Sequence, residues 1–445
     1  MKQLQTENEL RRLFSPAEQS AYLNDAGREQ SDIKTDEITM NFESPARGRL
    51  IIKGYHKVGE RNFVIKFMTE FYSLDDDLIK RKLTLVADAL TGVITAMLSQ
   101  RDNKESANKE HQGDIKDIPE LNWTEIKKSL QVTGNETVWQ LQKEGFKAFS
   151  AGQVAIPPVI HMSFKGHGDL HLKGAHKNGG EIYVFKIVTG FPHNSERGLL
   201  PTQGMMIAFD ATTGTPLVVL QDEGHLTDLR TAIAGRNAAQ ELMPADDLTG
   251  IGVLGTGVQA RLQLAQLQGL YPQCKKLVVW GRTPAKSFAY AKEMTENGWQ
   301  VTVADSPRKV ADHSNLIITT TSSEEALLDA DDITAANTLI IAIGADMPGK
   351  IELSPALLRK ADRVLIDSIN QGKDHGNATG AIKDGVISEF DLQEFGDFLL
   401  NGFIQNEDPK IKKAETENKL TIFLSSGIGV QDLQIVQAVT ESSKD

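Results

Sequence analysis

The sequence predicts an α/β protein, in which a doubly wound, Rossmann-type parallel sheet accompanies a strand-rich α+β domain. An apolar run from Thr249 ends in Gly255-Thr-Gly-Val-Gln-Ala260 and passes into Arg261–Leu270, whose leucine spacing suits a helix packed on a sheet. From Leu226 onward, strand and helix patterns alternate, which is typical of a parallel sheet. Before that point, strand patterns dominate the chain.

Composition excludes several classes of partner. The chain has 445 residues, enough for about two to three domains. Its formal charge of −12 disfavours nucleic acid and anionic membranes. The single cysteine, Cys274, excludes an internal disulfide and favours a reducing compartment. Residues 1–14 lack the apolar core of a signal peptide, and no apolar run approaches the length of a membrane span. We therefore expect a cytoplasmic protein that binds a small molecule, with no metal site.

In the first part of the chain, a polar segment is followed by strand patterns. Residues 1–37 are polar, with short helical patterns at 7–13 and 16–23. Leu78–Ala89 is a mixed amphipathic stretch, and residues 101–119 form a charged segment that suits an exposed linker. Strand patterns lie at Ile38–Phe42, Leu50–Tyr55, Asn62–Phe71 and Thr91–Ser99.

The second part alternates between helix and strand. Helical patterns lie at Thr231–Met243, Ala260–Leu270 and Ala285–Asn297, at the short pieces Lys309–Asp312 and Pro355–Lys360, and at Asp391–Asn401, Phe403–Lys419 and Val430–Val439. Strand patterns lie at Gly250–Leu254, Lys276–Trp280, Gln300–Ala304, Leu316–Thr321, Thr338–Ile343, Arg363–Ile366 and Thr421–Leu424.

An internal repeat links the two parts. The stretch Leu50–Lys57 returns 120 residues later as Leu170–Lys177, and Phe63–Lys66 returns as Tyr183–Lys186. Flanking pieces repeat with an offset of 122, as in Asp88-Ala-Leu-Thr-Gly and Asp210-Ala-Thr-Thr-Gly. Because the identities keep one order through strands and turns, we interpret the N-terminal segment as a truncated duplicate. Chance similarity between two strand-rich segments is the alternative.

The glycine turn suits a dinucleotide. Gly255 permits a sharp turn, Gly257 lets a pyrophosphate approach the backbone, and Ala260 allows close packing of helix on strand. The amides of the helix N-terminus then face the anion. We expect the cofactor to be bound by Gly255, Thr256, Gly257, Val258, Gln259 and Ala260, with Thr231. A glycine turn without a ligand is the alternative.

The end of the next strand indicates which dinucleotide is bound. An acid at this position bonds a ribose 2′-hydroxyl, whereas arginine accommodates a 2′-phosphate. Here the sequence reads Val279-Trp-Gly-Arg282-Thr283, with Lys286 following, so we expect NADP rather than NAD. A solvated arginine at a strand end is the other interpretation.

Three further residues could carry chemistry. Asp346 follows a strand on a Gly/Pro-shaped loop, where it could be a general acid or base or an ordinary loop aspartate. Lys186 lies inside an alternating apolar strand, so it either faces water or meets an anion. Arg230 lies at a helix entry and could bind a carboxylate through two parallel hydrogen bonds.

Together these positions resemble the ornithine cyclodeaminase/mu-crystallin family over about residues 120–440. The matching blocks, in order, are Lys186–Asn194, Phe209–Gly214, Leu226–Ala232, Gly255–Ala260, Gly344–Lys350 and Gly427–Asp432. The resemblance implies hydride transfer at the Cα of a small α-amino or α-imino acid. It also implies that Lys186 and Arg230 bind the substrate carboxylate and that Asp346 exchanges a proton. The family's basic residue near Pro158 is replaced by Val159, and His161 could substitute for it on the same strand face.

We therefore expect an NADP-dependent imine reductase or amino-acid dehydrogenase. Ornithine cyclodeaminase, a lyase that recycles NAD and releases ammonia, is the alternative within the family, and a non-catalytic NADPH-binding protein is a third reading. The expected domains are a degenerate duplicate at 1–100, a linker at 101–119, a substrate and dimerisation domain at 120–230 plus 402–445, and a Rossmann domain at 231–401. The duplicate predicts either an ordinary homodimer or a pseudo-dimeric monomer, and we prefer the latter because its strand edges need covering. Lys66 matches Lys186, but no second active site is expected.

Overall fold

The computed structural model describes residues 2–4, 33–42, 48–57, 62–72, 78–88, 90–102, 118–403 and 419–441. The chain divides into two compact units. The strand-rich unit comprises Met1–Asn135, Gln153–Leu226 and Asp432–Asp445, and the parallel-sheet unit comprises Glu136–Gly152 and Thr227–Gln431. None of the described helices is long and apolar enough to cross a membrane. The predicted helical patterns at 7–13 and 16–23, most of the predicted linker at 101–119 and most of the helical pattern at 403–419 lie outside the described residues.

The first sheet of the strand-rich unit contains β1 (Lys2–Leu4), β2 (Ile33–Phe42), β3 (Gly48–Lys57), β4 (Asn62–Tyr72), β5 (Leu78–Asp88) and β6 (Ile94–Asp102). Its strand order is β1-β6-β5-β4-β3-β2, and all neighbours are antiparallel except β1 and β6. The stretch predicted only as amphipathic is strand β5. Its residues Leu83, Leu85 and Ala87 alternate into the core between the sheets, and Thr84 and Val86 are buried on the other face.

The second sheet of this unit contains β7 (Glu120–Asn122), β8 (Val154–Ala155), β9 (Ile160–Phe164), β10 (Gly168–Lys177), β11 (Ile182–Gly190), β12 (Thr202–Asp210) and β13 (Pro216–Gln221). The order is β7-β13-β12-β11-β10-β8, with β9 also paired to β10. A short 3-10 helix, Pro192–Arg197, follows β11.

Helix α3 (Trp123–Thr133) was not predicted, although the sequence carries a signal for it. The Asn122 side chain accepts hydrogen bonds from the amides of Thr124 and Glu125, and Glu125 accepts one from the Asn122 amide. Within the unit, the Thr133 hydroxyl donates to the Ala438 carbonyl of the last helix, α13 (Gly429–Glu441), over 2.6 Å. This contact ties the C-terminal helix to the strand-rich unit.

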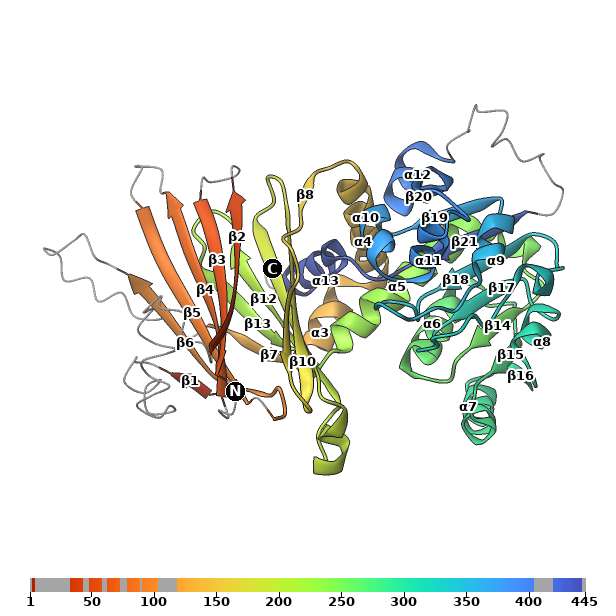
Figure 1. The fold of residues 1–445 in the computed structure, drawn as a ribbon, viewed down its shortest axis with the longest axis horizontal. Helices are drawn as coiled ribbons and strands as arrows, with labels where there is room; N and C mark the ends of the chain where they lie inside the picture. The colour runs from red at the N-terminus through yellow and green to blue at the C-terminus, as the bar shows by residue number, and fades with distance from the viewer. Residues whose placement is uncertain are drawn as a thin grey trace, which may run out of the picture. The chain divides into compact units, whose positions relative to one another are not determined.

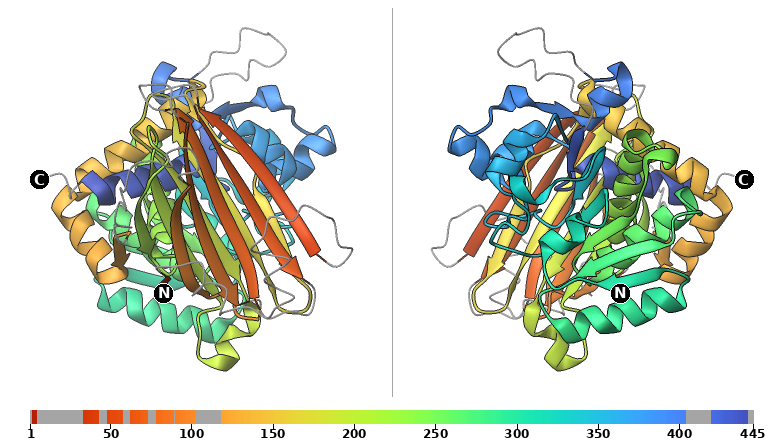
Figure 2. Two further views of the ribbon diagram at one scale, coloured as in Figure 1. Left: turned by 90° about the vertical axis from the view of Figure 1, so that its left-hand side faces the viewer. Right: turned by 90° about the vertical axis from the view of Figure 1, so that its right-hand side faces the viewer.

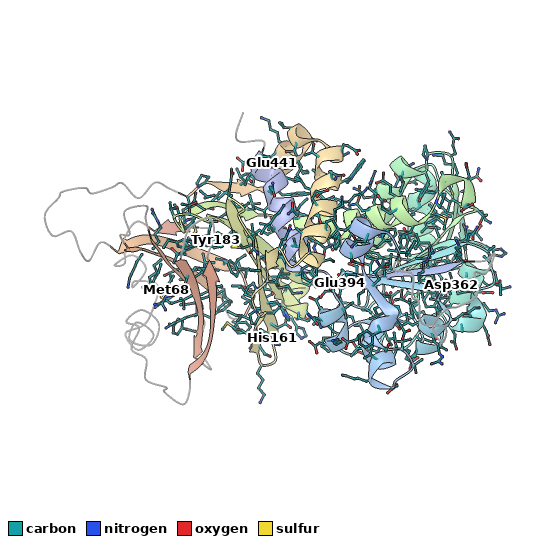
Figure 3. All side chains as sticks on the ribbon, turned by 90° about the horizontal axis from the view of Figure 1, so that it is seen from above. Met68, His161, Tyr183, Asp362, Glu394 and Glu441 are labelled. Atoms are coloured by element: carbon teal, nitrogen blue, oxygen red, sulfur yellow. The ribbon has the colours of Figure 1, made fainter. Side chains whose placement is uncertain are left out.

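The two sheets of the strand-rich unit pack face to face around one apolar core (Figures 1 and 2). The ring of Phe67 in the first sheet lies 5.7 Å from that of Phe185 in the second. Tyr183, labelled in Figure 3, stacks on Phe71 with ring centres 6.4 Å apart. Because side chains alternate along a strand, Lys186 on β11 points to the opposite face of the second sheet.

The parallel-sheet unit is a doubly wound α/β fold, as predicted. Its strands are β14 (Ile251–Leu254), β15 (Lys276–Trp280), β16 (Gln300–Val303), β17 (Leu316–Thr319), β18 (Thr338–Ala342), β19 (Arg363–Ile366), β20 (Leu392–Glu394) and β21 (Leu420–Leu424). The order is β16-β15-β14-β17-β18-β21-β19-β20, and every pair is parallel. The chain therefore builds outward on both sides of β14, which places the topological switch point between β14 and β17.

Helices flank this sheet. They are α4 (Asn135–Ser150), α5 (His225–Leu242), α6 (Val258–Leu270), α7 (Pro284–Glu296), α8 (Pro307–Ala311), α9 (Pro355–Lys360), α10 (Ile369–Asp374), α11 (Asn377–Lys383) and α12 (Phe395–Asn401), with 3-10 turns at Ala245–Asp247, Ala330–Asp332 and Glu389–Asp391. Helix α4, which was not predicted, packs in this unit through Phe146, whose ring lies 5.4 Å from that of Phe395.

The division of the chain differs from the expected one at its C-terminal end. Residues 402–445 were assigned to the substrate domain, but β21 pairs with β18 and β19 inside the parallel sheet. All five residues of β21 are buried, because a central strand of such a sheet is covered on both faces. Only Asp432–Asp445 belongs to the strand-rich unit.

Candidate active site

The glycine turn after β14 is shaped as a phosphate cradle. Gly255 has φ +118°, and its amide donates to the Trp280 carbonyl of β15 over 2.9 Å. A side chain at Gly255 would meet the Thr320 hydroxyl at 2.5 Å, so glycine is required there. At Gly257, the residue that caps α6, a Cβ would meet no atom within 4 Å. The backbone of the turn is therefore open at the point where a pyrophosphate would approach the helix N-terminus.

Arg261 holds this turn, and sequence reasoning did not single it out. Its guanidinium donates to the carbonyls of Thr256 at 2.7 Å and Gly257 at 3.0 Å. The same group is fixed by Glu293 of α7, which accepts from Nη2 at 2.6 Å. Because the turn's carbonyl oxygens are bound on one side, its amides are directed to the other.

The other residues predicted to bind the cofactor differ in exposure and in hydrogen bonding. Val258 is exposed on the first turn of α6, and Ala260 is fully buried below it. The Gln259 side chain is engaged in structure, since its amide donates to the Asp228 carbonyl and carboxylate. The Thr231 hydroxyl donates within α5 to the Thr227 carbonyl at 2.8 Å. For Gln259, only the backbone amide remains suited to a cofactor phosphate.

The end of β15 lies beside the glycine turn. A Cβ at Gly281 would lie 2.9 Å from the Thr256 methyl group, which shows how closely the two segments approach. Arg282, Thr283 and Lys286 are exposed here, at the start of α7. The segment 281–286 contains no acid. Its positive charges stand where a dinucleotide fold places the adenosine ribose.

Asp346 lies on the loop after β18 and is exposed. Its carboxylate is paired with Lys350 at 2.7 Å, and 49% of its side-chain surface is exposed. The buried acid of this loop is Glu352, which the sequence did not mark. Glu352 accepts from the Thr319 hydroxyl at 2.7 Å, the Thr321 amide at 2.6 Å and the Gly344 amide at 2.9 Å. Burial raises the pKa of Glu352, while these hydrogen bonds act to lower it.

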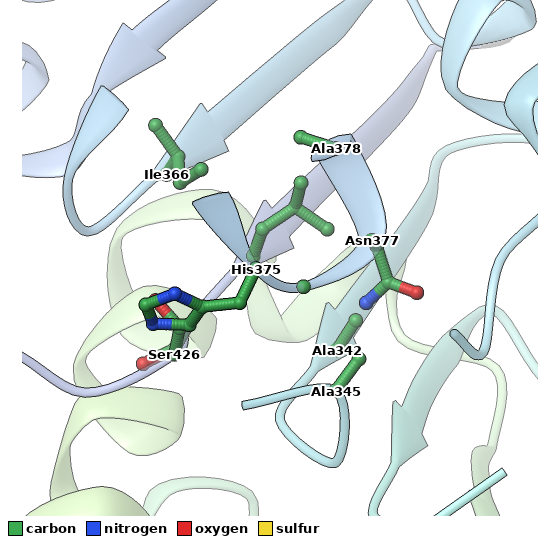
Figure 4. Close-up of a pocket in the computed structure, with 10 residues that line it drawn as sticks. Ala342, Ala345, Ile366, His375, Asn377, Ala378 and Ser426 are labelled. Carbon is green, nitrogen blue, oxygen red and sulfur yellow. The ribbon is translucent and has the colours of Figure 1, made fainter. Parts of the chain in front are cut away.

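A second buried acid, Asp367, shapes the turn after β21. It accepts hydrogen bonds from the amides of Ser426 at 2.8 Å and Gly427 at 2.7 Å. Burial raises the pKa of Asp367, against the effect of these bonds. A pocket of about 10 Å³, room for about one water, opens at this edge of the sheet (Figure 4). It is lined by Ala342, Ala345, Ile366, His375, Gly376, Asn377, Ala378, Leu424, Ser425 and Ser426.

Arg230 is seated on the same turn. A Cβ at Gly427 would lie 2.5 Å from Nη1 of Arg230 and 2.7 Å from Nη2, so the guanidinium lies directly against the glycine. Nη1 donates to Oε1 of Gln431 at 3.0 Å, and the Ile428 amide donates to the same oxygen. Arg230 is 5% exposed. Its position is therefore set by backbone on one side and by a neutral amide on the other.

In the strand-rich unit, Lys186 is buried in a polar cluster. Its ammonium lies 3.0 Å from Oδ1 and 2.8 Å from Oδ2 of Asp432. Asp222 follows β13, and it is close enough for the charges of Lys186 and Asp432 to act on its carboxyl group. Burial raises the pKa of Asp222 to about 6, while the Leu226 amide and Lys186 act to lower it. The other carboxylate oxygen of Asp222, Oδ1, is buried with no hydrogen-bond partner among the described residues.

His161 lies on the same face of this sheet. Alternation along β9 buries Ile160 and Met162 and turns His161 outward. His161 stacks on His171, its cross-strand neighbour, with ring centres 4.5 Å apart. Asp169 lies 3.4 Å from one imidazole and 3.3 Å from the other. The ligand atoms of the three lie within 4.8 Å of one another, so they could hold a metal ion, although none was expected.

Lys173 and Lys186 are directly paired across β10 and β11, so they share this face. His171 is two residues from Lys173 on β10, and burial lowers its pKa. Lys173 is therefore a second lysine on the face of the sheet that carries Lys186. The sequence analysis did not single it out, because only the strand register shows that the two lysines are neighbours.

The comparisons with known proteins identify the family of the chain. The model of the ornithine cyclodeaminase/mu-crystallin family matches residues 123–445. An uncharacterized cyclodeaminase of Sinorhizobium fredii is 30% identical over 68% of this chain and 89% of its own length. The alanine dehydrogenase of Archaeoglobus fulgidus is 30% identical over 68% of this chain and 88% of its own.

A solved structure is similar as well. The iminosuccinate reductase of Paracoccus denitrificans, crystallised with NAD⁺, superimposes with a TM-score of 0.65 at 25% identity, over 74% of this chain and 96% of that one. The fold class predicted from the sequence is confirmed. The relatives include an alanine dehydrogenase and an iminosuccinate reductase, and the latter was crystallised with NAD⁺. The chain belongs to the ornithine cyclodeaminase/mu-crystallin family.

Proposed function

We propose that the protein is an NADP-dependent reductase of small α-imino acids, which in reverse acts as an amino-acid dehydrogenase. The observation that carries the proposal is Lys186, a buried ammonium held by Asp432 beside the protonatable Asp222. Buried charges with perturbed pKa values are costly for the fold and gather at functional sites. Neither the core of the sheets nor the strand register needs a lysine at this position.

In this proposal the chain's own residues bind and polarise the substrate. Lys186 and Arg230 bind the α-carboxylate and polarise the C=N group, as the family resemblance implies. Asp346, on the loop after β18, gives a proton to the imine nitrogen as the imine carbon becomes C–H. The dinucleotide supplies the hydride when it is bound on the open turn at Gly257.

The preference for NADP rests on Arg282, Thr283 and Lys286. A guanidinium is suited to a 2′-phosphate, and segment 281–286 has no carboxylate to bond a 2′-hydroxyl. The test is the ratio of kcat/KM for NADPH and NADH. Arg282→Ala should lower this ratio about tenfold or more, since a charge-assisted contact is worth about 1.5–3 kcal/mol. Lys292→Ala, on the exposed side of α7, is the matched control and should leave the ratio unchanged.

The face beside Lys186 favours an anionic side chain on the substrate. Lys173 is the neighbour of Lys186 across the strands, and the similarity to an iminosuccinate reductase agrees with this reading. Ornithine cyclodeaminase is the alternative, because it belongs to the same family. A positive charge on Lys173 would repel the ammonium side chain of ornithine, which disfavours this substrate.

The experiment is a substrate panel with NADPH and NADH. Δ1-pyrroline-2-carboxylate, Δ1-piperideine-2-carboxylate, pyruvate with an amine, and oxaloacetate with ammonium are offered, and cofactor oxidation is followed at 340 nm. Steady oxidation that Lys186→Ala abolishes and Lys66→Ala spares is the expected result. Ammonia release from ornithine with no net change in NADH would instead assign a cyclodeaminase. Tight NADPH binding with no turnover on any member of the panel would assign a non-catalytic binding protein.

A further inference from the structure

We propose that the first sheet of the strand-rich unit is a second copy of the β7–β13 sheet and serves as its internal partner, related to it by an approximate two-fold axis. The apolar face of the catalytic sheet is then covered by the same chain and is not offered to a second chain. This inference rests on the geometry of the strand-rich unit and stands independently of the reaction proposed above.

The strand registers of the two sheets correspond position by position. Lys53 pairs with Lys66 across β3 and β4, and Lys173 pairs with Lys186 across β10 and β11, 120 residues later. The same holds one strand further on, where Lys66 faces Thr84 and Lys186 faces Met206. The edge strands agree as well, since β1 runs parallel to β6 as β7 does to β13. A register slip of one residue would destroy this agreement.

Irregular features repeat too, which chance similarity between strands does not produce. The β5–β6 ladder shifts register between Val86 and Ala87, and the β12–β13 ladder shifts between Ala208 and Phe209, 122 residues later. After each of these strands comes the same turn. The Asp88 carboxylate accepts from the amides of Leu90 and Thr91, as the Asp210 carboxylate does from the amides of Thr212 and Thr213.

The two copies also bury equivalent residues in the shared core. Each described residue that β3–β6 contribute to the core cluster has its counterpart, 120 or 122 residues later, in the same cluster. The pairs are Leu50/Leu170, Ile52/Leu172, Phe63/Tyr183, Ile65/Phe185, Phe67/Ile187, Phe71/Phe191, Leu83/Met205, Leu85/Ile207, Ala87/Phe209 and Met97/Val219. The sheets thus face each other through the same surface.

Contacts across this interface are reciprocal, which is the mark of a two-fold axis. A Cβ at Gly214 of the second copy would lie 2.7 Å from Cβ of Thr69 in the first. The equivalent Gly92 of the first copy stands in the same relation to Thr189 of the second, again at 2.7 Å. Phe71 lies next to Gly214, as Phe191 lies next to Gly92. The contact between Gly214 and Thr69 is therefore repeated, with the roles of the two copies exchanged, between Gly92 and Thr189.

The outer faces of the two copies have diverged. Lys186 is held by Asp432 of the C-terminal helix, whereas the equivalent Lys66 is fully buried with its ammonium 5.0 Å from the Tyr55 ring. Tyr55 corresponds to Ala175 in the second copy. Only the second copy continues into α5 and the parallel-sheet unit. The internal partner thus keeps the interface and lacks the catalytic surroundings.

The experiment is photo-cross-linking of the full-length protein. A benzophenone amino acid replaces Phe71, whose ring stacks on Tyr183, and the illuminated protein is run on a denaturing gel and digested for mass spectrometry. We expect cross-links to β11 or to the 210–214 turn, almost entirely within a band of single-chain mass. A band of two-chain mass carrying the same cross-links would overturn the proposal. Its detection does not require enzyme activity, so the outcome is independent of the proposed reaction.

Two further variants control the experiment. Benzophenone at Met68, which alternation places on the other face of β4, should give no cross-link to β11 (Figure 3). Benzophenone at Tyr183 probes the interface from the opposite side, should Phe71 prove essential for folding, and should label β4 within one chain. Light scattering is expected to give 48.8 kDa over a wide range of concentration. A two-chain mass together with cross-links between chains would refute the internal partnership.

Discussion

Asp222 should make the stability of the protein depend on pH, and the effect can be calculated. Its pKa is about 6 in the folded chain, against an ordinary value of 3.8. The difference of about 2 pKa units corresponds to roughly 3 kcal/mol, at about 1.4 kcal/mol per unit. A raised carboxyl pKa means that the folded state binds the proton more tightly than the unfolded state. Stability is therefore highest below pH 3.8 and declines as the pH rises towards 6.

Asp222→Asn removes the charge and keeps an oxygen that can accept from the Leu226 amide. The variant should match the wild type near pH 4 and exceed it increasingly up to about pH 6, with a constant advantage of up to about 3 kcal/mol above that. The measurement is the urea midpoint of unfolding from pH 4 to pH 8. Glu223→Gln changes the exposed neighbour in the same way and should shift the midpoint little at any pH. An advantage of Asp222→Asn that is equal at pH 4 and pH 8 would refute the assigned burial cost.

Three other outcomes follow from the site. Arg261→Met should raise KM for the dinucleotide about thirtyfold, because two carbonyl contacts worth about 1 kcal/mol each are lost from the turn, and Arg261→Lys should fall between the variant and the wild type. Initial rates against cofactor concentration check this. Gly427→Ala should raise KM for the imino acid tenfold or more, because the new methyl group displaces Arg230. It should leave the Kd of NADP unchanged, and calorimetry of cofactor binding separates the two effects. Lys173→Glu should shift preference from substrates with anionic side chains towards those with cationic ones, and an unchanged substrate ranking would contradict the assigned role.

The fold and the glycine turn after β14 could be predicted from the sequence because their signals are local. The Gly255–Ala260 turn, the alternation around it and the repeat around Lys66 and Lys186 are all contained in short stretches. The strand β5 escaped prediction because apolar residues lie on both of its faces, so Thr84 and Val86 are as buried as Leu85. A strand without a polar face lacks the alternation of apolar and polar residues by which strands are predicted.

The buried acids Glu352, Asp367 and Asp222 could not be identified from local sequence patterns. Glu352 binds groups at Thr319 and Thr321, and Asp367 binds the turn at Gly427, so their roles depend on contacts between distant segments. Asp222 gains its raised pKa from burial, which no local pattern records. Asp346 was chosen for its loop position, and the structure shows it exposed and paired with Lys350. Its role as proton donor stays a prediction.

The covalent link between the two sheets has a consequence for how the sequence of this protein can vary. In an assembly of identical subunits, every substitution appears on both sides of the axis, so a residue that suits one side must be tolerated on the other. In this chain, a change at Lys66 or Tyr55 leaves Lys186 untouched. Because the partner sheet is always present at a high effective concentration, we also expect the melting temperature to be the same in dilute and in concentrated solution.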